Sequence, residues 1–182
     1  MKKIFLLFSM ALLSLTASAG RYYDTEAEAG DFALGINLNN GLINPVLNWG
    51  LGAKMQFYAT RAFRLEGSFN GFIKRRDISY WDANLNLHYV FYLKEGFSFY
   101  PILGATFMHG RYNDGFYSNR EGCFGLNAGA GLQYDITENL YVMTEAVYKY
   151  SAERCLDDFD GSARNYYVGP RLNISIGIAY RF

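Results

Sequence analysis

The sequence is poor in the residues from which most catalytic and metal sites are built. Its 182 residues include only two histidines, two cysteines and three prolines. No His/Cys spacing typical of a metal site and no glycine-rich phosphate loop is present. Basic and acidic residues balance at 17 each, which gives no reason to expect a nucleic-acid partner. These absences predict a protein that uses no cofactor and no metal ion.

Helix signals are also scarce, except at the N-terminus. A lysine pair precedes an apolar run from Ile4 to Leu15, which is too short to span a bilayer, and a small-x-small site follows at Ala17–Ala19. This order is typical of a secretory signal peptide. We therefore predict a cleaved signal peptide over residues 1–19 and one mature domain over residues 20–182.

Alternation of apolar and polar side chains is what the sequence has in abundance. Successive side chains of a strand point to opposite faces, so an alternating segment predicts a strand with one apolar face. The predicted strands lie near 30–38, 48–59, 63–73, 80–93, 97–108, 123–134, 140–150 and 171–182. The fifth is the least regular, and its Pro101, which has no N–H for a ladder, predicts a strand end or a bulge. An even number of such strands can close without leaving an unpaired edge in lipid.

The connections between these segments also alternate in length. Short turns are expected near 60–62, 94–96 and 135–139, and longer loops near 39–48, 74–79, 109–122 and 151–166. Transmembrane barrels have short periplasmic turns and longer external loops, so both termini are expected in the periplasm. Trp49 and Trp81 should then lie near the outer interface. The aromatic residues expected near the inner interface are Tyr89, Phe91, Tyr134, Tyr180 and Phe182.

A soluble up-and-down barrel is the alternative to a membrane barrel. Its apolar face would point inward, and its outer face would carry lysine and glutamate. Here the polar face is dominated by asparagine, glycine and serine, with few charges. We therefore predict an all-β fold, an eight-stranded antiparallel up-and-down transmembrane β-barrel preceded by a signal peptide.

The last segment carries the most specific pattern. From Leu172 onward every second residue is apolar, and the sequence ends on an aromatic residue. This pattern resembles the assembly signal of bacterial outer-membrane β-barrels, which the barrel-assembly machinery reads. The matching residues are Ser175, Gly177, Tyr180 and Phe182.

With the hairpin over Gly129–Tyr134 and Glu138–Tyr148, the whole mature chain resembles the small OmpA/OmpX-type barrels and the wider family of outer membrane protein β-barrel domains. The resemblance implies a multi-pass protein of a Gram-negative outer membrane, in contact with lipid and lipopolysaccharide. OmpA proper continues into a peptidoglycan-binding domain. This sequence ends at Phe182, so we expect no such anchor.

The polar face of the predicted strands is expected to fill the barrel. Eight strands enclose a space just wide enough for their own side chains, and buried charges must be paired. The predicted lumen charge network is Lys54, Glu66, Asp82, Glu145, Lys149 and Arg171, with Arg64, Arg181 and His88 on the same face. We expect these charges to plug the lumen. A small gated path for polar solutes is the alternative.

The two cysteines, Cys123 and Cys155, are predicted to form a disulfide, because an exported chain with two cysteines favours pairing. Cys123 is expected at the top of the strand near 123–134, just after the third long loop, and Cys155 in the fourth loop, so the bond would brace two external loops against each other.

Catalysis has little support. Lipid-modifying barrel enzymes of the outer membrane place histidine beside serine at the outer rim. Here His109, expected to open the third loop, would have to meet Ser118 or Asp114. A solvated loop histidine is the simpler interpretation.

We therefore predict a non-enzymatic barrel that serves envelope structure or surface interaction, with the long loops as the place for an extracellular ligand. The alternatives are a transport or secretion accessory barrel or a small-solute channel and, with less support, a lipid-modifying enzyme.

Overall fold

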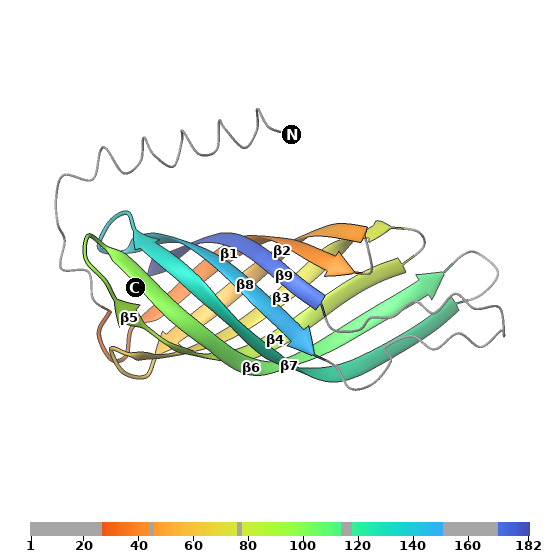
Figure 1. The fold of residues 1–182 in the computed structure, drawn as a ribbon, viewed down its shortest axis with the longest axis horizontal. Helices are drawn as coiled ribbons and strands as arrows, with labels where there is room; N and C mark the ends of the chain where they lie inside the picture. Colours follow the sequence, from red (N-terminus) through yellow and green to blue (C-terminus); the bar gives the residue numbers. More distant parts are fainter. Residues whose placement is uncertain (1–26, 44–45, 76–77, 114–117, 151–170) are drawn as a thin grey trace, which may run out of the picture.

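The computed structural model is built of antiparallel strands, and it describes residues 27–43, 46–75, 78–113, 118–150 and 171–182 (Figure 1). The strands are β1 (Phe32–Ile43), β2 (Val46–Tyr58), β3 (Phe63–Arg75), β4 (Ile78–Tyr89), β5 (Phe91–Tyr92), β6 (Phe97–Asn113), β7 (Ser118–Asp135), β8 (Leu140–Tyr150) and β9 (Arg171–Arg181). Across the described ranges, no helix has the length and apolar character needed to cross a membrane. The predicted signal peptide and the predicted fourth loop lie outside the described residues.

The sheet closes on itself. Its order is β4-β3-β2-β1-β9-β8-β7-β6-β5, and β4 also pairs with β6. The first and last strands pair antiparallel, with Ala33 opposite Arg181. The short β5 continues β4 past Val90 in the same register against β6, so the two act as one interrupted strand. The described residues thus form a closed eight-stranded antiparallel barrel, which confirms the predicted fold class.

Pro101 does not end its own strand, contrary to the prediction. β6 runs through it, and the register against β7 is unbroken. The interruption lies in the neighbouring strand, between His88 and Phe91, where the register puts Tyr89 opposite Pro101, which has no N–H to donate to β4. On the other side of this strand the pairing with the β3 side continues, since the Val90 N–H donates to the carbonyl of Ala62 at 2.7 Å. The missing donor therefore breaks the adjacent strand rather than bending β6.

Several predicted loops are strand. β1 and β2 are joined through residues 44–45 and β3 and β4 through 76–77, so the long loops expected near 39–48 and 74–79 were wrong. Most of the loop expected over 109–122 belongs to β6 and β7, which have 17 and 18 residues. Hydrogen bonds between strands do not depend on side-chain polarity, so polar residues at these ends mark contact with water and not the end of a strand. The expected alternation of loop lengths fails for these three connections.

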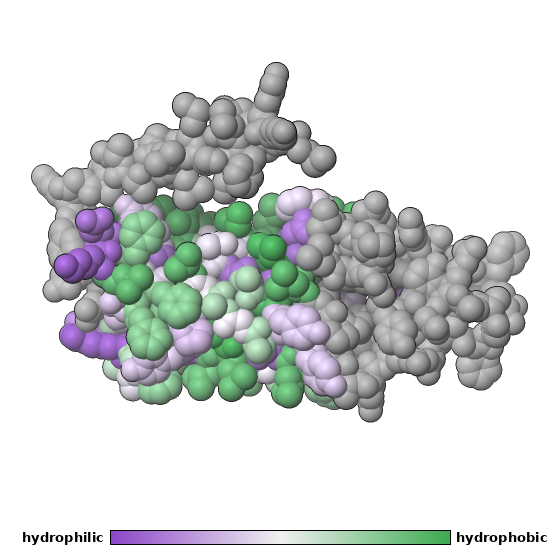
Figure 2. Space-filling view, viewed as in Figure 1, coloured by the Kyte–Doolittle hydropathy of each residue, from purple (hydrophilic) through white to green (hydrophobic). Residues whose placement is uncertain are grey.

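Side chains alternate between the wall's two faces. Large apolar residues cover the outside, and Ile36, Leu51 and Phe124 are 67%, 72% and 77% exposed. Figure 2 shows apolar side chains over much of the visible wall. The inward rows carry charged, amide and tyrosine side chains instead. The wall thus has the polarity expected in lipid, apolar outside and polar inside.

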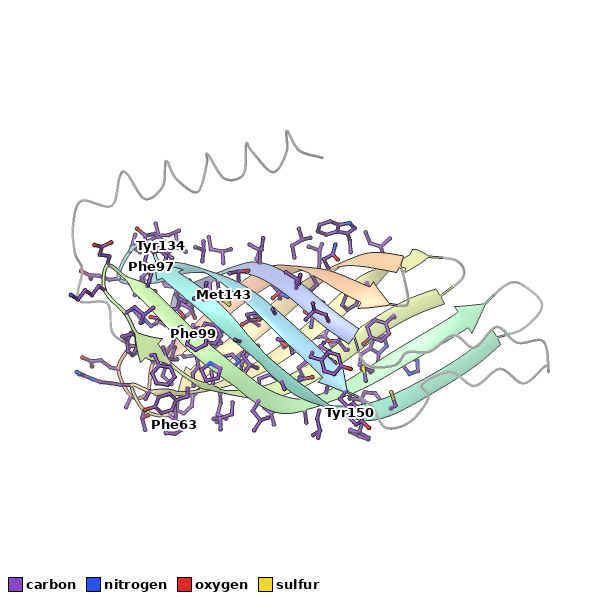
Figure 3. All side chains as sticks on the ribbon, viewed as in Figure 1. Phe63, Phe97, Phe99, Tyr134, Met143 and Tyr150 are labelled. Carbon is purple, nitrogen blue, oxygen red and sulfur yellow. The ribbon has the colours of Figure 1, made fainter. Side chains whose placement is uncertain are left out.

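Aromatic residues gather toward the two ends of the wall. Figure 3 shows Phe63, Phe97, Phe99 and Tyr134 toward one end and Tyr150 toward the other. The rings of Phe97 and Tyr134 lie 4.7 Å apart. Such belts are typical of membrane interfaces.

Candidate functional site

The centre of the lumen holds one lysine between two glutamates. Lys54 on β2, Glu66 on β3 and Glu145 on β8 are each at most 5% exposed. The Lys54 ammonium lies 3.4 Å from both carboxylate oxygens of Glu66 and forms a close ion pair with Glu145. One ammonium group therefore bridges carboxylates from opposite parts of the wall.

Neutral donors complete the hydrogen bonding of these carboxylates. Glu66 accepts from Gln56 and Asn86 at 2.7 and 3.3 Å, and Glu145 accepts from Tyr100 and Ser175 at 2.9 and 3.2 Å. A buried charge is tolerated only when it is paired and hydrogen-bonded, because it has lost its hydration. This arrangement meets both conditions.

Arg64 on β3 forms a second buried centre. Its side chain is completely buried, and it donates to His88 Nδ1 at 3.1 Å, to the Tyr58 hydroxyl at 3.0 Å and to Gln133 at 2.7 Å. The guanidinium lies 4.4 Å from the ring centre of Tyr100, within the range of a cation–π contact. The His88 ring stacks on the same tyrosine at 4.9 Å. Because Nδ1 accepts a hydrogen bond here, His88 is neutral in this arrangement.

An amide layer adjoins the charged centre. It consists of Asn37, Asn39, Asn70, Asn84, Asn86, Asn127 and Asn173. Asp82 accepts from two members of this layer, Asn70 and Asn84, at 2.8 and 2.7 Å and lies 2.8 Å from the Lys149 ammonium. Gly52 makes room for the layer, since a Cβ there would lie 2.0 Å from Asn70 Oδ1.

The buried charges of the described lumen balance. Four cations face four anions: Lys54, Arg64, Lys149 and Arg181 against Glu66, Asp82, Asp135 and Glu145. A cavity beside the amide layer has a volume of about 20 Å³. A single water needs about 10–15 Å³, so the space holds one water and no hydrated ion. At the level of the amide layer and the charged centre, the side chains of the described residues therefore fill the lumen.

The structure places the predicted lumen residues Lys54, Glu66, Asp82, Glu145 and Lys149 inside the barrel. The backbone of Arg171 pairs with that of Lys149, and its side chain lies outside the described part of the structure. Arg64, Arg181 and His88 are also buried.

Three tyrosines complete this interior. Alternation places Tyr58 and Tyr141 on the polar face of their strands, so sequence reasoning missed one of the three, Tyr100. The side chains of Tyr58, Tyr100 and Tyr141 are almost completely buried in the lumen. Tyr100 lies in the predicted strand near 97–108, where both faces are largely apolar, so alternation could not decide whether its side chain points into the lumen or outward. Gly131 could have indicated the inward direction of Tyr100. It stands opposite Tyr100 on the neighbouring strand, and its lack of a side chain leaves space for the tyrosine ring.

Glu66, His88 and Glu145 bring their donor atoms within 4.8 Å of one another, which raises the question of a metal site. The Lys54 ammonium, however, already pairs with both carboxylates, and Arg64 donates to the imidazole. A metal ion would have to displace this cation and break these bonds. The arrangement therefore fits an internal lysine better than a metal.

His109 does not open a loop, contrary to the prediction. It lies within β6, opposite Trp81 on β4 and Gly122 on β7, and its ring is 5.3 Å from that of Trp81. Ser118 begins β7 opposite Asn113, four residues out of register with His109. The backbone positions of the histidine and serine that an enzyme would need are therefore not paired across this ladder, and Asp114 lies outside the described residues.

Cys123 points into the barrel and packs against Phe72, Tyr80 and Met108. It lies in a strand, as predicted, but β7 begins at Ser118, before the predicted start of that strand. Cys155 lies outside the described residues, so the disulfide remains a prediction.

The residues of the predicted assembly signal divide between the two faces of β9 and the end of the chain. Ser175 and Gly177 face the lumen, whereas Tyr180 and Phe182 face outward with their rings 4.9 Å apart.

Comparison with known proteins gives the same architecture. A family model described as outer membrane protein beta-barrel domain matches residues 6–182. The N-terminal β-barrel domain of Pseudomonas aeruginosa OprF is 15% identical, with a TM-score of 0.69 over 86% of this chain and 100% of that one. Neisserial surface protein A is 12% identical, with a TM-score of 0.64 over 84% and 96%.

Ail, the attachment invasion locus protein of Yersinia pestis, is 20% identical, with a TM-score of 0.55 over 85% of this chain and 99% of that one. At these identities the solved structures show the fold alone. Among curated proteins, none matches the sequence.

Proposed function

The chain belongs to the outer membrane protein beta-barrel domain family, and from that premise we propose that it is a non-enzymatic barrel with a plugged lumen. It serves the cell envelope as a structural element or as a surface for interaction. The observation that carries this proposal is the balanced network of buried charges in the lumen, with a cavity of only about 20 Å³ beside it. A filled interior leaves the ends of the barrel as the surfaces available for a function.

The end at which β6 and β7 project favours surface interaction. β8 ends at Tyr150, opposite Leu126, so the residues of β7 from Ser118 to Gly125 extend past it. Figure 1 shows this hairpin reaching farther than the other strands. Recognition residues are commonly held on projections from a rigid scaffold.

A related structure bears on the kind of extracellular ligand. Ail of Yersinia pestis has been solved in complex with the heparin analogue sucrose octasulfate. That finding concerns Ail. For this chain we propose only that an extracellular ligand binds at the projecting end, alongside outer-membrane lipid and lipopolysaccharide.

We further propose that residues 1–19 are removed on export and that both termini lie in the periplasm. The two ends of the described barrel support a shared location, since the Phe182 N–H donates to the Phe32 carbonyl at 2.8 Å. The barrel-assembly machinery would read the pattern over Ser175–Phe182 during insertion.

An epitope inserted after Asp114, in the link between β6 and β7, tests the orientation. We expect antibody to bind intact cells and the purified protein to migrate differently on gels with and without boiling. Binding only after permeabilisation would overturn the proposed surface role, and migration unchanged by boiling would argue against a barrel. Altered lipid A in expressing cells that reverts with His109→Ala would instead favour the enzyme alternative.

A further inference from the structure

Five rings form a continuous cluster on the outer wall. The cluster consists of Phe69 on β3, Trp81 on β4, Phe107 and His109 on β6, and Phe124 on β7. Trp81 lies at its centre, with ring centroids 5.3 Å from Phe69, 5.7 Å from Phe107 and 5.3 Å from His109. We call these five residues the outer aromatic cluster.

Glycines flank the Trp81–His109 pair on both sides. Along one row of the sheet, Gly71 stands opposite Trp81, Trp81 opposite His109, and His109 opposite Gly122. The ring of Phe107 lies over Gly122, only 2.7 Å from where a Cβ would be, whereas a Cβ on Gly71 would meet nothing within 4 Å. The wall therefore has an open notch beside Trp81, at Gly71.

The height of this cluster matches a membrane interface. Strands of such barrels rise about 3.4 Å per residue and tilt by about 40°, so each residue adds about 2.6 Å of height. Trp81 thus lies about 21 Å from the level of Tyr89 at the other end of β4, against an apolar band of about 25 Å. Ser79, two residues farther out, lies about 26 Å from that level. Trp81 is at the edge of the apolar band, and the next outward residues reach the lipid headgroups.

Arg111 stands at that headgroup level. It lies opposite Ser79 and is the next outward residue of β6 after His109; the Ser79 hydroxyl donates to its carbonyl at 3.4 Å. Its Nε is shielded from solvent and has no hydrogen-bond partner among the described residues. At this level the guanidinium reaches the lipid headgroups, whose phosphate oxygens can accept hydrogen bonds from its N–H groups.

We propose that Arg111, His109 and Trp81, with the notch at Gly71, bind a phosphorylated glycolipid of the lipid A type in the outer leaflet. Arg111 donates to a phosphate oxygen, for which the planar guanidinium is well suited. Trp81 and His109 border the headgroup, and an acyl chain passes over Gly71. The cationic rim and the apolar cluster below it complement the two parts of such a lipid. This inference rests on the proposed function, because it requires the β6–β7 end to face the cell exterior.

Binding is measured on the full-length mature protein in nanodiscs of phosphatidylcholine. Trp49 and Trp81 are the two tryptophans of the chain, so Trp49→Phe leaves Trp81 as the only tryptophan reporter. Its emission is followed while bisphosphorylated lipid A, or the same lipid without phosphates, is added. We expect the phosphorylated lipid to bind about tenfold more tightly, the range expected for one charge-assisted hydrogen bond.

Three variants in the Trp49→Phe background separate the parts of the site. Arg111→Gln should remove the preference for the phosphorylated lipid. Gly71→Leu should weaken the binding of both lipids, because its side chain fills the notch. Lys94→Gln, which removes a cation from the turn at the opposite end, should behave as the parent protein. Equal binding of the two lipids by the parent, or an unchanged preference in Arg111→Gln, would overturn the proposal. In a nanodisc both ends of the barrel are accessible to added lipid, so the measured affinities do not depend on which end faces the cell exterior. A failed epitope test would therefore refute the proposed orientation and leave these affinities unchanged.

Discussion

The packing of Tyr100 against Gly131 offers a sharp test of the filled lumen. A Cβ on Gly131 would lie 2.3 Å from Tyr100 Cζ and 2.6 Å from its hydroxyl oxygen. The ring has no free space to retreat into, because it is fully buried between the Arg64 guanidinium and the His88 ring and donates to Glu145 at 2.9 Å. Gly131→Ala should therefore displace the ring and weaken these three contacts.

The expected cost follows from the contacts that are lost. Overpacking a well-packed interior costs about 1–3 kcal/mol, and a hydrogen bond to a charged group contributes about 1.5–3 kcal/mol. We expect Gly131→Ala to lower the free energy of unfolding by about 3–5 kcal/mol. Urea titration in lipid vesicles, followed by heat-modifiable migration on gels, measures this difference.

Two controls decide whether the collision is the cause. Gly67 lies on the outer face of β3, where a Cβ would come no closer than 4.0 Å to the Met55 side chain. Gly67→Ala should change the stability by less than about 0.5 kcal/mol, as surface substitutions usually do. In a Tyr100→Ala background, Gly131→Ala should cost little, because the ring is absent. Equal losses in the two backgrounds, or a neutral Gly131→Ala, would refute the packing described above.

Three further outcomes are expected. Lys54→Met leaves two buried carboxylates without their cation, so it should destabilise the barrel by about 3–5 kcal/mol in the same urea assay, and an unchanged midpoint would contradict the ion pairing. Phe182→Ala should reduce the amount of folded protein in outer-membrane fractions while leaving the stability of the inserted barrel nearly intact; normal insertion would exclude this residue from the assembly signal. Cys123 and Cys155 should resist thiol labelling in the unfolded protein until a reductant is added, whereas immediate labelling would rule out the disulfide.

The faces of the strands were predictable from the sequence, and the strand ends were not. Alternation assigns Lys54 and Glu66 to one face because every second side chain of a strand points the same way. The ladder continues beyond the membrane wherever backbone groups pair, so polar residues near Asn39 and His109 were mistaken for loops. Pro101 misled for a related reason, since its missing N–H acts on the neighbouring strand.

The partners across the lumen were also beyond the sequence. Lys54 and Glu145 are 91 positions apart and meet only because the barrel closes between β1 and β9. The charge types predicted a balanced interior, but closure and register decide which ammonium meets which carboxylate. The same holds for Arg64, whose contact with Gln133 spans 69 positions.

Conductance across a planar lipid bilayer tests the plugged lumen most directly. Purified barrel, shown to be folded by its heat-modifiable migration, is inserted at neutral pH in a membrane with a steady applied voltage. Because buried charges fill the lumen and the cavity beside the amide layer holds about one water, we predict no stable current steps above the bare membrane. Long-lived steps of uniform size would contradict the plug and would support the small-solute channel instead.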